Sequence, residues 1–287
     1  MSLIDDVNKI IDPPIQAQPK STLIDYVETI MSDQSTSVAD KDTEQDVNLF
    51  KGHLDLVNMN QLSKTRVLMI GAGSIGSFAA LAMVKMGVGE IVIFDDDKIE
   101  PHNFANQLYP YTAMGVAKID VLRKILTEMG ANKPETGVKI NLEARRFIDT
   151  DLSYVKQSDI VICAVDNMAT RILLWEMCKK SIHTSLYVDC RIGGTQLDCF
   201  ALESGDPDDI DFFESKDHEG KSNFLYSSKE TVQLKCTEKS IIFPVMFSAG
   251  WISTCVYHYA NNTIKRLPRS ITYMMGNLNI PSSMVSR

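Results

Sequence analysis

The sequence predicts an α/β protein in which a Rossmann-like, mostly parallel sheet carries helices on both faces. Three observations support this fold class. Short apolar runs alternate with amphipathic stretches from residue 62 onward, which is the rhythm of repeated βαβ units. The first run, RVLMI, leads directly into the glycine-rich GAGSIG (71–76), which is typical of a strand-to-helix turn. Acidic residues follow two of the later runs, at the edge where open parallel sheets bind their ligands.

The individual elements follow in chain order. Strands are expected at 66–70, 90–94, 138–147, 159–165, 185–190 and 196–202, with two last strand-like pieces around SITYMMG. Helices are expected from 74 to about 85, from 116 to 128, from 167 to about 181, and over 241–260, which is entered at Pro244. The polar, acidic stretch 203–230 is too long for an ordinary connection, so we expect a crossover loop or lid that passes over the site.

Residues 1–45 differ in composition from the rest of the chain. They contain Pro13-Pro14 and a polar stretch at 32–46, and they lack a long apolar period. We therefore expect a flexible N-terminal leader followed by one folded domain over 46–287. Within the leader the pattern LIDxVxxI occurs twice, starting at Leu3 and at Leu23, with its apolar residues on one helical face. Two interpretations stay open: a repeated docking peptide, or two short turns that are alike by chance.

Charge and cysteine content exclude several classes of protein. The chain has 29 basic and 37 acidic residues, a net charge of −8, so neither nucleic acid nor an anionic membrane is an expected partner. No apolar run approaches the roughly 18 residues of a membrane span, and the N-terminus lacks a signal-peptide pattern, so we expect a cytoplasmic protein. The six cysteines include no CxxC pair. This spacing argues against a zinc site and a disulfide scaffold, and we expect most of the thiols to be reduced and buried.

The glycine turn by itself suits more than one nucleotide. Gly71, Gly73 and Gly76 would let backbone N–H groups approach a phosphate at the positive end of the following helix. That chemistry serves NAD and ATP alike. Asp95 stands about 20 residues further on, where a dinucleotide fold holds a ribose hydroxyl, and this spacing taken alone fits an NAD enzyme.

The polar residues beyond the second strand favour a different nucleotide site. Asn103, Asn106 and Gln107 come just after the carboxyl end of that strand, on one face if the segment coils. Lys118, near the start of the next helix, can reach the same crevice as a counter-charge for phosphate. Asp166 ends the strand DIVICAV and is well placed for Mg²⁺, which uses one or two carboxylates together with substrate phosphates.

Six pieces of sequence carry a resemblance to a known family. In order they are RVLMIGAGSIGS, IVIFDDDKIEPHNFANQ, GVAKID, VICAVDNMATR, VDCRIGG and KCTEKSIIFP, and they cover residues 62 to about 260. This ordered set, far more specific than the glycine turn, resembles the ThiF/MoeB and ubiquitin-activating superfamily of adenylating enzymes. The resemblance implies ATP-dependent activation of a carboxylate as an acyl-adenylate with release of pyrophosphate. It also implies ATP and Mg²⁺ as cofactors, and no zinc.

The resemblance also implies a role for each matched residue. Asp97, with Asp95 as a second candidate, would hold the ribose. Asn103 and Lys118 would contact the phosphates, and Asp166 would hold magnesium. The full set of implied nucleotide contacts is Gly71, Gly73, Gly76, Asp95, Asp97, Asn103, Asn106, Gln107, Lys118 and Asn167.

A cysteine in the crossover segment completes the implied catalytic set of Cys236, Lys118 and Asp166. Cys236-Thr237 resembles the Cys-Thr pair of the ubiquitin-activating branch. Lys235 and Lys239 flank this thiol, so it could be an activated nucleophile that takes the acyl group as a thioester. The implied substrate is the C-terminus of a ubiquitin-like or sulfur-carrier protein, or of a peptide. The implied assembly is a homodimer.

Departures from the family pattern leave alternatives open. Asn106 stands where the family usually has an arginine, and residues 44–55 contain no arginine that could join a partner subunit's phosphate site. Arg191 could compensate or could line a groove for the incoming C-terminus, and Arg171 could be structural. The alternatives are adenylation of a peptide or of a modified tRNA base, a ThiF-like binding scaffold without catalysis, and, least favoured, an NAD oxidoreductase.

Overall fold

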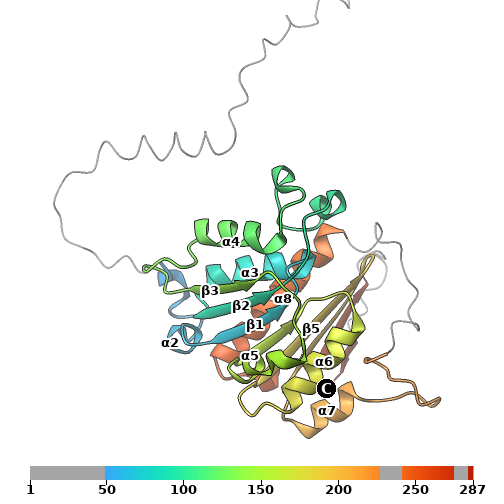
Figure 1. The fold of residues 1–287 in the computed structure, drawn as a ribbon. Helices are drawn as coiled ribbons and strands as arrows, with labels where there is room; N and C mark the ends of the chain where they lie inside the picture. Colours follow the sequence, from blue (N-terminus) through green and yellow to red (C-terminus); the bar gives the residue numbers. More distant parts are fainter. Residues whose placement is uncertain (1–48, 227–240, 275–283, 287) are drawn as a thin grey trace, which may run out of the picture. The chain divides into compact units, whose positions relative to one another are not determined.

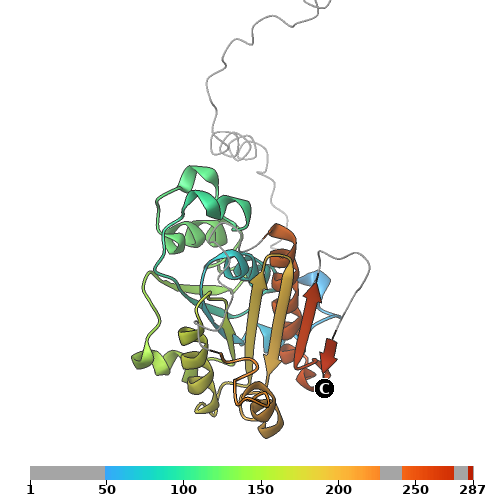
Figure 2. The ribbon, with the colours of Figure 1, turned by 90° about the vertical axis from the view of Figure 1, so that its right-hand side faces the viewer.

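Apolar runs of the sequence form the central sheet of the protein. The computed structural model describes residues 49–226, 241–274 and 284–286, all within one compact unit, Val47–Arg287. Its strands are β1 (Arg66–Ile70), β2 (Glu90–Phe94), β3 (Lys139–Glu143), β4 (Ile160–Cys163), β5 (Leu186–Gly193), β6 (Gln196–Leu202), β7 (Ser270–Met274) and β8 (Met284–Ser286). They form one sheet in the order β3-β2-β1-β4-β5-β6-β7-β8 (Figure 1). The first five strands are parallel, whereas β6, β7 and β8 pair antiparallel at one side (Figure 2). This confirms the predicted fold class.

Helices cover both faces of this sheet (Figure 1). One face carries α2 (Met59–Leu62), α3 (Ser74–Met86), α4 (Lys118–Glu128) and α8 (Ile242–Ala260), and the other carries α5 (Leu152–Lys156), α6 (Met168–Lys179) and α7 (Pro207–Phe213). Val67 and Met69 of β1 belong to the first core, while Leu68 and Ile70 belong to the second. Successive residues of a strand point to opposite faces, so one apolar run supplies both cores.

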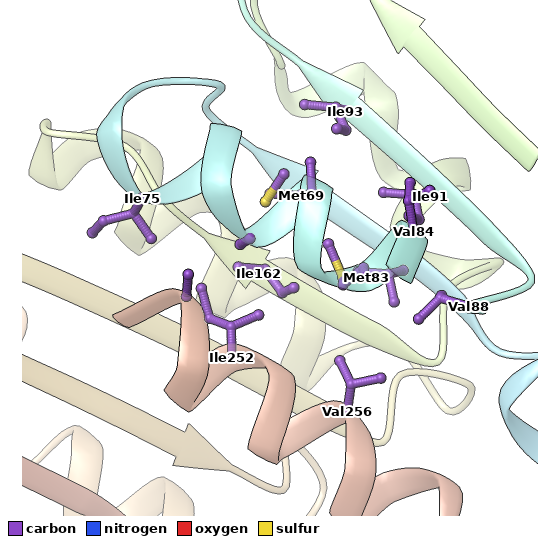
Figure 3. Packing of buried hydrophobic residues seen from close by; sticks show 14 of the residues in the cluster. Met69, Ile75, Met83, Val84, Val88, Ile91, Ile93, Ile162, Ile252 and Val256 are labelled. Atoms are coloured by element: carbon purple, nitrogen blue, oxygen red, sulfur yellow. The ribbon is translucent and has the colours of Figure 1, made fainter. Parts of the chain in front are cut away.

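The first core is centred on the contact between α3 and α8. Met83 of α3 lies opposite Ile252 and Val256 of α8, near the strand residue Ile162 (Figure 3). All four side chains are fully buried. Burying each contributes about 1.5–3 kcal/mol. Pro244 lies in the first turn of α8, as predicted, where no N–H of the helix ladder is lost.

The third strand is shorter than its apolar pattern predicted. β3 ends at Glu143 rather than at residue 147. Arg145 turns aside to donate two hydrogen bonds of 2.8 Å to the carboxylate of Asp151, and Ile148 N donates to the same carboxylate at 2.9 Å. This local ion pair fixes a bend where the alternating pattern suggested further strand.

The acidic segment after β6 is more ordered than the predicted loop or lid. Asp206 caps α7 by accepting from Asp208 N at 2.9 Å, and Phe213 at the end of that helix is fully buried. Phe224 stacks on Phe213 with ring centroids 5.9 Å apart. The segment through residue 226 therefore packs against the sheet. The predicted leader (1–45) and Cys236 lie outside the described residues.

Candidate active site

The glycine turn lies between β1 and α3 and shows why two of its glycines are required. Gly71 has φ +101°, and a Cβ there would lie 2.5 Å from the carbonyl oxygen of Ala164, just after β4. A Cβ on Gly76 would lie 1.9 Å from Gly71 O, so only glycine lets α3 approach the turn. A Cβ on Gly73 would meet nothing within 4 Å. Gly73 thus faces open space at the start of α3, where a phosphate could approach.

Asp95, at the end of β2, braces this turn. Its carboxylate accepts from Ala72 N at 2.7 Å and from Asp97 N at 2.9 Å. Burial raises the pKa of Asp95, against the opposing influence of the nearby Lys118 ammonium and of these backbone hydrogen bonds. Both of its oxygens are thus engaged by the protein's own backbone, and of the two predicted ribose partners Asp97 is the more available.

Lys118 and Asp97 form an ion pair at the same edge of the sheet. Lys118 Nζ lies 2.8 Å from Asp97 Oδ2, and the backbone N–H of Lys118 donates to Asp97 O at 3.0 Å. The lysine side chain is only 7% exposed and the aspartate side chain is 64% exposed. A nearly buried ammonium is therefore held against an accessible carboxylate, next to Asp95 and the glycine turn.

The amide residues predicted to point into the site have mixed outcomes. Asn103 is buried, and its Oδ1 accepts from Glu100 N at 2.9 Å, so this oxygen closes the 3₁₀ turn Pro101–Ala105. Asn106 and Gln107 follow, each with its backbone N–H bonded to Asn103 O. Gln107 Oε1 is buried without a hydrogen-bond partner among the described residues. A buried amide oxygen of this kind is available to a donor from a ligand.

Tyr109 was not predicted, although it fastens this segment to the glycine turn. Its hydroxyl donates to Ala72 O at 2.5 Å, and it is 3% exposed. Burial, with the charges of Asp95 and Asp97 nearby, raises the pKa of Tyr109, so the hydroxyl stays protonated and keeps its donor role. The turn, the end of β2 and the 98–110 segment therefore form one connected unit.

Asp166 and Asn167 lie where β4 leads into α6. Asp166 is exposed beyond the carboxyl end of the strand, as predicted. Asn167 is the N-cap of α6, and its side-chain oxygen accepts a hydrogen bond from Thr170 N at 2.9 Å. Asparagine is a preferred N-cap residue, so this oxygen stabilises the start of the helix. The neighbouring strands β1, β2 and β4 thus bring the glycine turn, Asp97 and Asp166 to one edge of the sheet.

A buried ionic cluster next to Asp166 was missed. Asp189 of β5 is fully buried and pairs with Arg171 through one oxygen and with Arg191 Nη2 through the other, at 2.6 Å. Arg191 Nη1 also donates to Phe224 O at 2.7 Å. An aspartate inside the apolar run SLYVDC was the available signal, because a buried carboxylate requires a partner. Arg191 is fully engaged here, which argues against its use as a replacement for the family's arginine.

The donor set of this edge fits Mg²⁺ carried by a phosphate ligand. Among the described residues no three His, Cys, Asp or Glu side chains are grouped to hold a metal. Mg²⁺ needs no such cage, since it binds through one or two carboxylates and keeps water and phosphate ligands. Asp166 would supply that carboxylate. The cysteines that the structure describes, Cys163, Cys178, Cys190, Cys199 and Cys255, are free and buried, as expected.

Fold and candidate site together define an α/β protein with a Rossmann-like sheet, in which a glycine turn and polar side chains gather at the carboxyl edge of the parallel strands. The model of the ThiF family matches residues 46–277. The chain therefore belongs to the ThiF family, which confirms the resemblance of its sequence pieces.

Curated relatives match parts of the chain. "Adenylyltransferase and sulfurtransferase MOCS3" of Culex quinquefasciatus is 34% identical over 119 residues, 41% of this chain and 26% of its own length. "Sulfur carrier protein ThiS adenylyltransferase" of Escherichia coli is 31% identical over 144 residues, 50% of this chain and 55% of its own length. The matched regions thus span from about a quarter to about half of these relatives.

Solved structures share the fold at low identity. The PaaA structure covers 96% of this chain and 88% of its own, with a TM-score of 0.61 and 12% identity. E. coli MccB with AMPCPP and MccA covers 85% of this chain and 75% of its own, with a TM-score of 0.63 and 15% identity.

In the residues described, none of the helices has the length and apolar character that a bilayer crossing requires.

Proposed function

We propose that this protein is an adenylyltransferase that activates a carboxylate with ATP, and that the carboxylate is the C-terminus of a ubiquitin-like or sulfur-carrier protein. The observation that carries the proposal is the edge where the open position at Gly73, the Lys118–Asp97 pair and Asp166 follow three adjacent strands. Membership of the ThiF family and relatives named as adenylyltransferases support it.

The site would hold the nucleotide in the following way. The N–H groups at the start of α3 would bind phosphate oxygens, since the helix presents its positive end there. Asp97, being accessible, would accept from a ribose hydroxyl. Lys118 would exchange part of its contact with Asp97 for a phosphate oxygen. Gln107 would offer its buried oxygen to a donor of the nucleotide or the substrate.

The reaction requires charge control more than covalent help from the protein. A substrate carboxylate oxygen attacks the α-phosphorus, the bond to the pyrophosphate oxygen breaks, and acyl-adenylate and pyrophosphate result. Lys118 offsets negative charge that grows on the phosphates in the transition state. Mg²⁺, when bound at Asp166, would neutralise triphosphate charge.

ATP–pyrophosphate exchange tests the proposal directly. We expect radiolabelled pyrophosphate to enter ATP only when a ubiquitin-like or sulfur-carrier protein from the same source is present. Asp166→Ala should lower this exchange at least 100-fold. Asp211→Ala is the matched control, because Asp211 is an exposed carboxylate on α7. No exchange with any carrier protein, or equal exchange in wild type and Asp166→Ala, would contradict the proposal.

Three further features belong to the same proposal. Cys236 would attack the acyl-adenylate carbonyl through its thiolate, forming a thioester and releasing AMP; acid-stable, thiol-labile capture of the carrier protein checks this. A homodimer is supported by exposed apolar side chains on α8, among them Phe243 and Met246, and light scattering gives its mass. A cytoplasmic location is supported by the free thiols, and fractionation of the source cells checks it.

Two alternatives share part of the support. A peptide C-terminus or a modified tRNA base could replace the carrier protein, and exchange assays with these substrates decide between them. Asn106, at the position of the family's arginine, favours a binding scaffold without catalysis. Calorimetry that finds no Mg-ATP binding but intact partner binding would support the scaffold.

A further inference from the structure

We propose that Asp189 is a positioning residue that fixes the Asp166 loop on one side and the 214–226 segment on the other, through Arg171 and Arg191. The link to catalysis rests on the proposed function, because it assigns Mg²⁺ to Asp166. The link to structure rests on the ionic cluster alone.

The first arm runs from Asp189 to the loop that carries Asp166. Arg171, 5% exposed, pairs with Asp189 and donates a second hydrogen bond to the backbone carbonyl of Val165. It also lies 3.5 Å from Cys190 O. Val165 directly precedes Asp166, so the guanidinium sets where the chain leaves β4. A lysine has one nitrogen and cannot hold both acceptors with the planar, two-pronged geometry of arginine.

The second arm runs from Asp189 to the chain beyond α7. Arg191 donates to Asp189 Oδ2 through Nε and Nη2, at 3.1 and 2.6 Å, and to Phe224 O through Nη1 at 2.7 Å. Its guanidinium carbon lies 4.9 Å from the ring centroid of Phe200 and 5.8 Å from that of Tyr226. The aromatic contacts and the carbonyl bond tie this segment to β5.

Asp189 couples the two arms because each of its oxygens serves one arginine. The carboxylate is fully buried, and neither arginine has another carboxylate partner among the described contacts. If one of the two ion pairs is weakened, the other must adjust around a carboxylate that bulk solvent does not reach. The effects of changing Arg171 and Arg191 should therefore not add.

The test uses the full chain and conservative variants, because removal of Asp189 itself would leave two buried cations and could prevent folding. Arg171→Lys and Arg191→Lys keep the positive charge. Arg269→Lys is the matched control, since Arg269 pairs with Asp209 at the far end of β6 and β7. The first readout is amide hydrogen exchange of the ligand-free protein. We expect exchange at residues 164–167 to rise about tenfold or more in Arg171→Lys, and exchange at 222–226 in Arg191→Lys, with neither changed in Arg269→Lys.

The second readout is the Mg²⁺ dependence of nucleotide binding. In Arg171→Lys, the Mg²⁺ concentration required for half-maximal ATP binding should rise about tenfold, because Mg²⁺ binds more weakly. ATP binding measured in EDTA should stay at the wild-type value. In the double variant Arg171→Lys/Arg191→Lys, the fold-change in amide exchange should differ from the product of the fold-changes in the two single variants. Unchanged exchange at 164–167 in Arg171→Lys overturns the positioning role, whatever ATP does. Raised exchange at 164–167 together with a wild-type Mg²⁺ dependence overturns only the link to Asp166. If the wild-type chain fails to bind Mg-ATP, the proposed function is overturned, whereas the hydrogen-exchange result still tests the structural role of Asp189.

Discussion

The variant Gly73→Ala should show whether Gly73 is needed for phosphate binding or for the packing of the turn. Gly73 has φ −73° and ψ −147°, so alanine can keep this φ but must move ψ by about 30° to reach the β region, and an added Cβ would meet no heavy atom within 4 Å. Replacing glycine by alanine at an N-cap costs about 0.5–1 kcal/mol. The smaller conformational freedom of the unfolded chain returns about 0.4–1 kcal/mol. The free energy of unfolding should therefore stay within about 1 kcal/mol of wild type.

Nucleotide binding should respond much more strongly than stability. The new methyl group would stand where a phosphate approaches the N–H groups of α3 and would prevent at least one charge-assisted hydrogen bond. Such a bond contributes about 1.5–3 kcal/mol, so the dissociation constant for Mg-ATP should rise about 10-fold to 100-fold. Calorimetry with Mg-ATP measures binding, and urea denaturation measures stability.

Gly76→Ala provides the contrasting variant. Alanine is favoured over glycine in a helix by about 1 kcal/mol. The added Cβ would lie 1.9 Å from Gly71 O, however, and a backbone contact this close can be relieved only by moving α3. Overpacking of this kind costs about 1–3 kcal/mol, so we expect net destabilisation.

One outcome for Gly73→Ala would contradict the assignment of the open position to phosphate. If this variant keeps its stability and binds Mg-ATP with wild-type affinity, the open position at Gly73 does not receive a phosphate.

Two further predictions concern ion pairs. Lys118→Met keeps the buried stem but removes the ammonium; Asp97 is largely exposed, so stability should change by less than about 1 kcal/mol, while pyrophosphate exchange should fall about 100-fold. Wild-type exchange in this variant would exclude Lys118 from the site. The Arg145 ion pair lowers the pKa of Asp151, so its contribution to stability is present above the unfolded pKa of about 3.9 and is lost as the pH falls through the lower, folded value. Urea denaturation between pH 7 and pH 3 should show a smaller acid-induced loss in Asp151→Asn than in wild type, and equal losses would contradict the assignment.

The sequence was sufficient to predict the parallel half of the sheet. Strands buried on both faces are read as continuous apolar runs, and each run ended within a few residues of its expected position. Gly71 was also predictable, because a turn this tight between β1 and α3 requires positive φ. The extension of the third strand to residue 147 was wrong, because an alternating pattern does not reveal that Arg145 and Asp151 pair across a bend.

The contacts that define the site depended on which strands are neighbours. Asp95 contacts the N–H of Ala72, 23 residues earlier, and Asp189 meets Arg171 only because β5 lies next to β4. A motif assigns each residue to a ligand, whereas the structure shows that several motif residues bind the protein's own backbone. Asp95, Asn103 and Asn167 are of this kind. They shape the site, and the groups left to meet a ligand are fewer than the motif suggests.

The balance of charged side chains at the carboxyl edge of the sheet shows what the neutral Asn106 means for the binding of a triphosphate. The arginines of the Asp189 cluster are directed to Asp189, Val165 and Phe224, so they do not replace the arginine that the family has at position 106. Lys118 is already paired with Asp97, and Asp95 and Asp166 add negative charge nearby. A nucleotide triphosphate brought to this edge would therefore meet little net positive charge from the described residues. Under the proposed function, its binding would depend on the N–H groups of α3, on the metal ion that accompanies it, and on Lys118 once its ammonium exchanges part of its contact with Asp97 for a phosphate oxygen.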